Sequence, residues 1–141
     1  MDCSKACSLA ISQVLSAMRR EDARRWRLLI DRPCALRSAE YHRYGDGGSV
    51  ADLEHRDQGS LLTLTVLLSP EGECAPGSGV LSLATAAGTG APFAECPLRR
   101  GDGCLFVSEK RHNVSTVSGA RRSFVIELWS SAAPNEFNRH S

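Results

Sequence analysis

Hydrophobic positions near the start of the chain recur at close to helical spacing. The apolar residues from Ser4 onward follow this pattern, and Pro33 stands where it should stop; they are Ile11, Val14, Leu15, Met18, Trp26 and Leu29. This spacing predicts one or two helices over residues 5–30. Arginines occupy the other side of the pattern, and an amphipathic segment of this kind usually covers one face of a sheet.

After Pro33 the pattern changes to short strand-like runs separated by turn residues. The predicted strands cover residues 36–44, 49–56, 61–69, 79–84, 92–97, 103–107, 111–117 and 121–129. Turn signals between them are Gly45-Asp46-Gly47-Gly48, Ser69-Pro70-Glu71-Gly72, Gly101-Asp102-Gly103 and Ser118-Gly119. About eight strands at this spacing predict a mainly β sandwich or jelly roll with an N-terminal helix packed on it. The small residues of 84–92 predict a surface loop.

The 141 residues fit one ordinary domain with one site. We expect an N-terminal helical segment over 1–35, a β-barrel over 36–130 and a polar, frayed tail over 131–141.

Charge and composition exclude several classes of partner. The formal net charge is +1, with acidic and basic residues nearly balanced, so charge does not support nucleic acid as an obligate partner. No apolar run reaches the roughly 18 residues of a membrane-spanning helix, and we expect neither a membrane nor a nucleic-acid partner. Without a recognisable leader sequence, a cytoplasmic or otherwise intracellular protein is expected. The oligomeric state is not indicated.

The motif His55-Arg56-Asp57 lies at the end of one predicted strand and carries the first chemical signal. Side chains alternate along a strand, so His55 and Asp57 are expected on the same side and Arg56 on the other. Downstream, His112 opens another predicted strand and can supply a third ligand. Two histidines and one carboxylate on one side of a metal leave positions open, an arrangement that suits non-haem Fe(II) oxygenases.

A second signal, Arg121-Arg122-Ser123, begins nine residues after His112. By the same alternation Arg121 and Ser123 share one side, where a guanidinium and a hydroxyl can hold a carboxylate. Arg122 is expected to point away.

Together these residues resemble the pattern of the 2-oxoglutarate- and Fe(II)-dependent oxygenases, in the branch that includes prolyl 4-hydroxylases and lysyl hydroxylases. The resemblance covers about residues 40–130. The matching elements, in the family's order, are Tyr44, His55-Arg56-Asp57, the strand LLTLTVLLS, Pro76-Gly77-Ser78-Gly79, Gly101-Asp102-Gly103-Cys104-Leu105-Phe106, His112 and Gly119-Ala120-Arg121-Arg122-Ser123.

The resemblance implies a double-stranded β-helix and a dioxygenase that hydroxylates a C–H bond. It implies Fe(II) held by His55, Asp57 and His112, with no catalytic residue beyond these ligands. It further implies 2-oxoglutarate as co-substrate, held by Arg121, Ser123 and Tyr44, together with O2 and with ascorbate as an optional reductant. The implied substrate is a peptidyl prolyl or lysyl residue first, and a small metabolite second.

Three departures from the family pattern keep alternatives open. Thr116-Val117 stands where many relatives have Pro-Val, and Arg121 comes one residue earlier than their basic residue, so Arg122 is an alternative for the co-substrate. The helical segment before the barrel is shorter than in most relatives. The rival interpretations are a catalytically degenerate barrel that binds a ligand or a partner protein, and a cupin-like protein with another metal.

Overall fold

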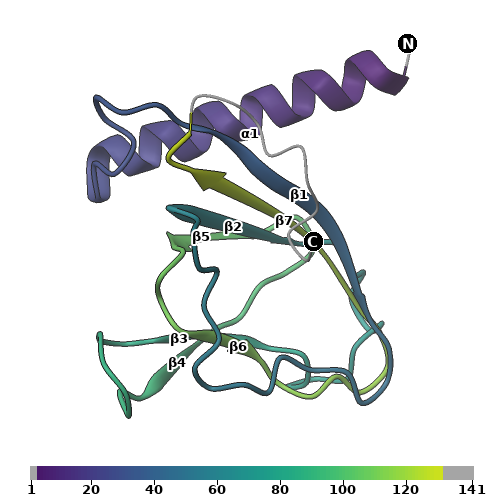
Figure 1. Ribbon diagram of the computed structural model, residues 1–141. Coiled ribbons are helices and arrows are strands. Elements are labelled where there is room, and N and C mark those ends of the chain that lie inside the picture. Colours follow the sequence, from purple (N-terminus) through teal and green to yellow (C-terminus); the bar gives the residue numbers. More distant parts are fainter. Residues whose placement is uncertain (1–2, 132–141) are drawn as a thin grey trace.

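The computed structural model describes residues 3–131 and contains one helix followed by seven strands (Figure 1). The elements are α1 (Cys3–Arg25), β1 (Ala35–Tyr44), β2 (Leu62–Leu67), β3 (Leu81–Ala84), β4 (Phe93–Cys96), β5 (Gly103–Val107), β6 (His112–Val114) and β7 (Arg121–Trp129). The strands form a four-stranded sheet in the order β1-β7-β2-β5 and a three-stranded sheet in the order β4-β3-β6. The described strand pairs are antiparallel. The protein is therefore mainly β, a double-stranded β-helix, as predicted.

Strands β2 and β7 separate an apolar face of the larger sheet from a polar one. On one face Leu62 is paired with Leu128, and both side chains are almost fully buried. On the other face Thr63 is paired with Glu127, both also buried. Alternation along the run LLTLTVLL produces this division directly. The apolar face forms the core with the helix, and the polar face is turned into the barrel.

Helix α1 covers the apolar face of the larger sheet (Figure 1). Met18 lies in one buried cluster with strand residues Leu62, Ile126 and Leu128, and each such buried side chain contributes about 1.5–3 kcal/mol of hydrophobic stabilisation. The prediction of a helix packed on the sheet is confirmed.

The end of α1 is fixed by Asp22, which is buried. Its carboxylate accepts hydrogen bonds from the backbone N–H groups of Leu28 at 2.9 Å and Leu29 at 2.8 Å. These bonds satisfy donors in the connection after the helix, where Arg27 adopts a φ of 58°. The chain turns there and leads into β1.

The strand predicted over 49–56 is not formed. Val50 makes an isolated bridge to Val114, and the chain then turns at Leu53 and Glu54. Asp52 causes the turn, because its carboxylate accepts the Glu54 N–H at 2.9 Å and its carbonyl accepts the His55 N–H at 3.2 Å. Asp side chains favour such turns over extended backbone. His55 therefore lies in an irregular segment rather than in a strand.

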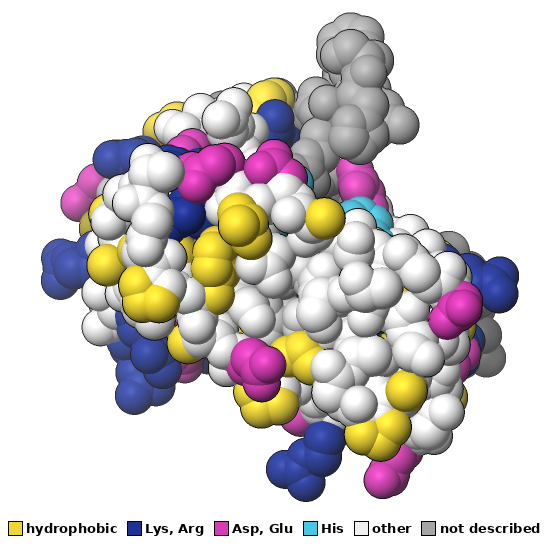
Figure 2. All heavy atoms as spheres, turned by 90° about the horizontal axis from the view of Figure 1, so that it is seen from below, with side chains coloured by type: hydrophobic (Ala, Val, Ile, Leu, Met, Phe, Trp, Pro, Cys, Tyr) yellow, Lys and Arg dark blue, Asp and Glu magenta, His cyan; other side chains and the backbone are white. Residues whose placement is uncertain are grey.

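Exposed parts of the molecule follow the sequence pattern. Most residues of the predicted loop 84–92 are exposed. On the face shown in Figure 2, acidic and basic side chains are both present around the edge and apolar ones lie between them.

Within residues 3–131, no helix has the length and apolar character needed to cross a membrane. Beyond Ser131 the expected polar tail lies outside the described residues.

Candidate metal centre

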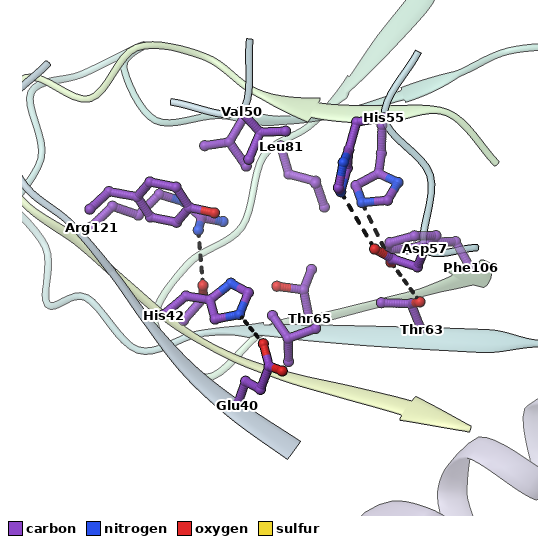
Figure 3. Close-up of a pocket in the computed structure, with 15 residues that line it drawn as sticks. Glu40, His42, Val50, His55, Asp57, Thr63, Thr65, Leu81, Phe106 and Arg121 are labelled. Carbon is purple, nitrogen blue, oxygen red and sulfur yellow. Dashed lines mark hydrogen bonds and ion pairs between the residues drawn. The ribbon is translucent and has the colours of Figure 1, made fainter. Parts of the chain in front are cut away.

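Three side chains that could bind a metal meet inside the barrel. One ligand atom from each of His55, Asp57 and His112 lies within 4.8 Å of the others. The Nε2 atom of His55 is 3.5 Å from Oδ1 of Asp57, and the Nε2 atom of His112 is 3.5 Å from Oδ2 of Asp57 (Figure 3). Ligand atoms about 2.1 Å from one ion, at right angles, are about 3 Å apart. The donor set and its spacing therefore fit a divalent transition metal.

Backbone hydrogen bonds, rather than strand alternation, place two of these side chains. The His55 carbonyl accepts the N–H of His112 at 3.2 Å, which brings the two imidazoles to a centroid separation of 4.7 Å. The Asp57 N–H donates to the Ser108 carbonyl at 3.0 Å. The irregular segment that carries His55 and Asp57 is thereby tied to the connection between β5 and β6.

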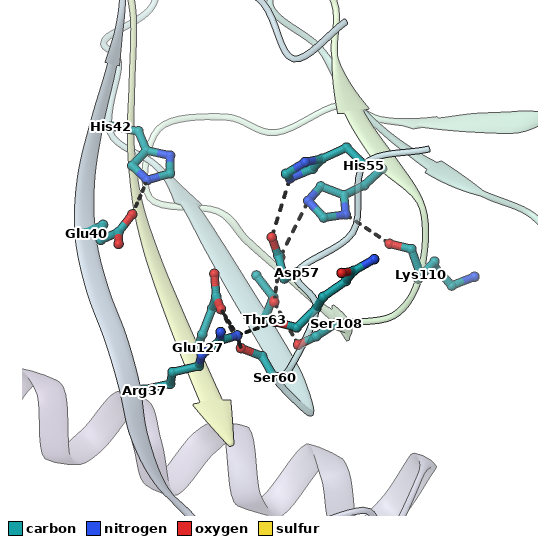
Figure 4. Close-up of polar contacts among 12 residues, drawn as sticks. Arg37, Glu40, His42, His55, Asp57, Ser60, Thr63, Ser108, Lys110 and Glu127 are labelled. Atoms are coloured by element: carbon teal, nitrogen blue, oxygen red, sulfur yellow. Dashed lines mark hydrogen bonds and ion pairs between the residues drawn. The ribbon is translucent and has the colours of Figure 1, made fainter. Parts of the chain in front are cut away.

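Neighbouring groups orient the three side chains. Nδ1 of His112 lies 2.9 Å from the carbonyl of Lys110, so an N–H there donates to that oxygen and Nε2 is left to coordinate. Thr63 donates its hydroxyl to Oδ2 of Asp57 at 2.8 Å and lies 2.9 Å from the hydroxyl of Ser108 (Figure 4). Partners of this kind are typical of metal centres, where they fix ligand orientation.

The Thr63→Val variant is expected to bind a divalent metal about tenfold or more weakly, because Asp57 loses the hydrogen bond that fixes its carboxylate. Isothermal titration with Mn(II) measures this affinity. Thr65→Val is the matched control, because Thr65 is buried in the same strand and lines the same cavity. Equal affinities of the two variants would contradict this role for Thr63.

Arg121 lies at the other end of the cavity, with only 3% of its surface exposed. Its Nε donates to the carbonyl of Gly79 at 2.9 Å, and Nη1 donates to Oγ of Ser123 at 3.0 Å. The ring of Tyr44 lies 5.7 Å from the guanidinium carbon. Gly79 has a φ of +61°, and a Cβ there would come 3.1 Å from Cδ of Arg121, so glycine allows this close approach.

Arg122 lies on the opposite face of β7. Its guanidinium holds Glu73 with two contacts, Nη2 to Oε1 at 2.8 Å and Nε to Oε2 at 3.0 Å. This hydrogen bond lowers the pKa of Glu73 and raises that of Arg122. Of the two arginines, Arg121 is the one that lines the cavity.

Burial sets the protonation preferences around Arg121. Desolvation lowers the pKa of the guanidinium, which still carries its charge at neutral pH. Desolvation also raises the pKa of Tyr44, which keeps its phenol neutral and able to donate a hydrogen bond. The site thus offers a cation, a phenol and the hydroxyl of Ser123 to an anionic ligand.

A cavity of about 190 Å³ joins the two ends (Figure 3). Its walls come from both sheets and from the segment before β2; the lining residues are Glu40, His42, Tyr44, Val50, His55, Asp57, Thr63, Thr65, Leu81, Phe106, His112, Val114, Arg121, Ser123 and Val125.

Sequence reasoning missed two polar residues of this cavity, Glu40 and His42. A signal was available, because strand alternation from Tyr44 places His42 and Glu40 on the same side as Tyr44. Thr63 was also missed, and only its contact with Asp57 singles it out.

An ion pair between the partly buried Arg37 and the fully buried Glu127 supports the loop that follows Asp57 (Figure 4). Arg37 on β1 donates from Nη1 to the carbonyl of Gln58 at 2.6 Å and to the hydroxyl of Ser60 at 2.7 Å. The same Nη1 lies 3.5 Å from Oε2 of Glu127, which is fully buried on β7 and also accepts a hydrogen bond from Ser60. The network connects β1, β7 and the Asp57 loop.

A scan against protein-family models finds no match, and no curated protein matches the sequence. The fold is similar to that of an oxidoreductase of the 2OG-Fe(II) oxygenase family from Burkholderia pseudomallei, with a TM-score of 0.61 and 16% identity over 78% of this chain and 51% of that one. It is also similar to a prolyl hydroxylase from Trichoplax adhaerens solved with a hypoxia inducible factor peptide fragment, with a TM-score of 0.61 and 17% identity over 86% and 56% of the two chains.

A prolyl-4-hydroxylase from Pseudomonas putida gives a TM-score of 0.54 and 18% identity over 66% of this chain and 52% of that chain. At these identities the likeness shows a shared fold. The chain spans about half the length of these three structures.

Proposed function

We propose that the protein is an Fe(II)- and 2-oxoglutarate-dependent dioxygenase that hydroxylates a C–H bond of its substrate. The observation that carries this function is the cavity itself. A cluster of two imidazoles and one carboxylate lies at one end, and the buried cation of Arg121 lies at the other (Figure 3). A metal site alone does not require that cation, whereas a dicarboxylate co-substrate spanning the cavity does.

His55, Asp57 and His112 would hold the metal on one side and leave its remaining positions open to other ligands. Bound Fe(II) and 2-oxoglutarate would supply the reduction of O2, coupled to decarboxylation of 2-oxoglutarate to succinate and CO2 and to hydroxylation of the substrate. The chain's own contribution is to orient the ligands through Thr63 and Lys110 and to keep water from the reacting groups.

At the other end Arg121 would bind the distal carboxylate of the co-substrate. Its Nη1 and the Ser123 hydroxyl lie 3.0 Å apart, so both can face one carboxylate group. The neutral phenol of Tyr44 would donate a further hydrogen bond.

For the substrate we propose a peptidyl prolyl or lysyl residue first and a small metabolite second. The similar structure from Trichoplax adhaerens is a prolyl hydroxylase in complex with a peptide fragment, which supports the choice of a peptidyl substrate. The near-neutral net charge favours neither choice.

The Arg121→Met variant is expected to bind metal as the unmodified protein does and to bind 2-oxoglutarate about 10–100-fold more weakly. A hydrogen bond to a charged group contributes about 1.5–3 kcal/mol, and 1.4 kcal/mol corresponds to tenfold in affinity. Titration of 2-oxoglutarate into metal-loaded protein without oxygen measures the change.

Arg122→Met is the matched control, because Arg122 is the next residue and points away from the cavity. If Arg122→Met weakens binding and Arg121→Met does not, the co-substrate is bound elsewhere. If the unmodified protein binds metal but no 2-oxoglutarate, the proposed dioxygenase function is wrong. The interpretation as a barrel that binds another ligand then takes its place.

A further inference from the structure

Two polar side chains of the cavity, Glu40 and His42, take no part in the metal cluster or in the Arg121 site. Both lie on the inner face of β1, where Glu40 is paired in register with Val125 and His42 with Ser123. Nε2 of His42 is 2.8 Å from Oε2 of Glu40 (Figure 3). Because Tyr44 on the same strand is paired with Arg121, Glu40 lies further from the Arg121 end than His42 does.

The pair lies on a more accessible wall than the Arg121 end of the cavity. The side chains of Glu40 and His42 are 27% and 31% exposed, close to the 34% of His55 at the metal end, whereas Arg121 is 3% exposed. Strand β1 is also the edge of its sheet, with β7 as its neighbour on one side. A molecule that enters the cavity beside β1 would meet this pair.

Glu40 differs from the other carboxylates inside the barrel in its partners. Glu127 faces Arg37, and Asp57 faces the two histidines of the cluster and Thr63. Among residues 3–131, no arginine or lysine forms an ion pair with Glu40, and its ionic partner is an imidazole that is charged only when protonated. A carboxylate in a partly enclosed site without a cation favours a ligand that supplies one.

The charge balance of the occupied site strengthens this preference. The charges of a divalent metal, Asp57, Arg121 and a dicarboxylate co-substrate cancel one another. Glu40 would then be the remaining negative group beside the open part of the cavity.

We propose that Glu40, held in place by His42, recognises an ammonium or guanidinium group of the substrate, an inference that rests on the proposed function. The substrate is accordingly a compound or side chain whose cation lies near the carbon to be hydroxylated. Between the two peptidyl residues, this favours a lysine-type side chain, because the ring of a peptidyl proline carries no cation. His42 is a positioning residue here, and Glu40 contacts the substrate.

The test uses protein loaded with Fe(II) and 2-oxoglutarate without oxygen, after the visible absorption of the metal chelate has been recorded. Nα-acetyl-lysine amide, Nα-acetyl-arginine amide and the neutral Nα-acetyl-norleucine amide are then titrated, with calorimetry and the shift of that absorption as readouts. One of the two cationic probes is expected to bind about tenfold more tightly than the neutral probe. Glu40→Gln should abolish the preference while leaving the chelate absorption unchanged. Glu95→Gln, which changes an exposed carboxylate on β4, should preserve the preference.

Each result separates the two proposals. If the chelate absorption forms but neither cationic probe is preferred, including the case in which no probe binds, the role of Glu40 is wrong and the dioxygenase stands. The same holds if Glu40→Gln keeps the full preference. If the chelate absorption never forms in folded, metal-loaded protein, the proposed function fails and the substrate inference fails with it.

Discussion

Replacing Asp57 by Ala is expected to abolish metal binding, with a loss of more than about 100-fold in affinity. Changes in groups that merely orient a metal ligand cost about 10–100-fold, and Asp57 supplies the carboxylate itself. Its two oxygens each face one imidazole at 3.5 Å, so no other described carboxylate can replace it in the cluster. Calorimetric titration with Mn(II), followed by metal analysis of protein purified without oxygen, measures the loss.

Asp102→Ala is the control for this variant, because Asp102 is an exposed carboxylate in the turn before β5. It should bind metal as the unmodified protein does. Circular dichroism of both variants accompanies the titration, so that the loss of metal binding is measured on folded protein. Full metal affinity in folded Asp57→Ala would refute the assignment of these ligands.

Arg37→Ala is expected to lower the free energy of unfolding by about 3–5 kcal/mol, because it leaves the carboxylate of Glu127 buried without its cation. Glu127 is fully buried, and Arg37 also holds Gln58 and Ser60 in the loop after Asp57. Urea unfolding followed by fluorescence measures the change. The same variant should weaken metal binding, because that loop carries a ligand.

The double variant Arg37→Met, Glu127→Met separates charge from packing. It removes both charges, so its stability should be closer to that of the unmodified protein than the stability of Arg37→Ala is. Arg99→Ala is the surface control, because the Arg99 side chain is 96% exposed and its loss should change stability by less than about 0.5 kcal/mol. Equal effects of Arg37→Ala and Arg99→Ala would show that the buried pair does not stabilise the fold.

Much of the fold could be predicted from local pattern, because a half-buried strand repeats every two residues. Alternation in the run LLTLTVLL predicts both the apolar face under α1 and the polar face inside the barrel. The same alternation, applied to Arg121 and Arg122, correctly separates the inward arginine from the outward one. Helical spacing predicts α1, although the helix ends at Arg25 rather than near residue 30.

The candidate site shows where local pattern is insufficient. His55 and Asp57 were expected together because of a strand that does not form, since Asp52 makes a turn there. They lie together because of backbone contacts with His112 and Ser108, which are more than 50 residues away in sequence. The pairing of Arg37 with Glu127 is likewise a contact between distant strands, which no periodicity reports. The role of His55, Asp57 and His112 as metal ligands stays a prediction. So does the binding of the co-substrate by Arg121, Ser123 and Tyr44.

The most direct test of the dioxygenase is to add Fe(II) and then 2-oxoglutarate to purified protein without oxygen and to record the visible spectrum. A weak metal-to-ligand absorption is expected, and succinate should form once oxygen is admitted. Both should be lost in Asp57→Ala, and the absorption should require more 2-oxoglutarate in Arg121→Met. No absorption and no succinate from folded, iron-loaded protein would contradict the proposed function.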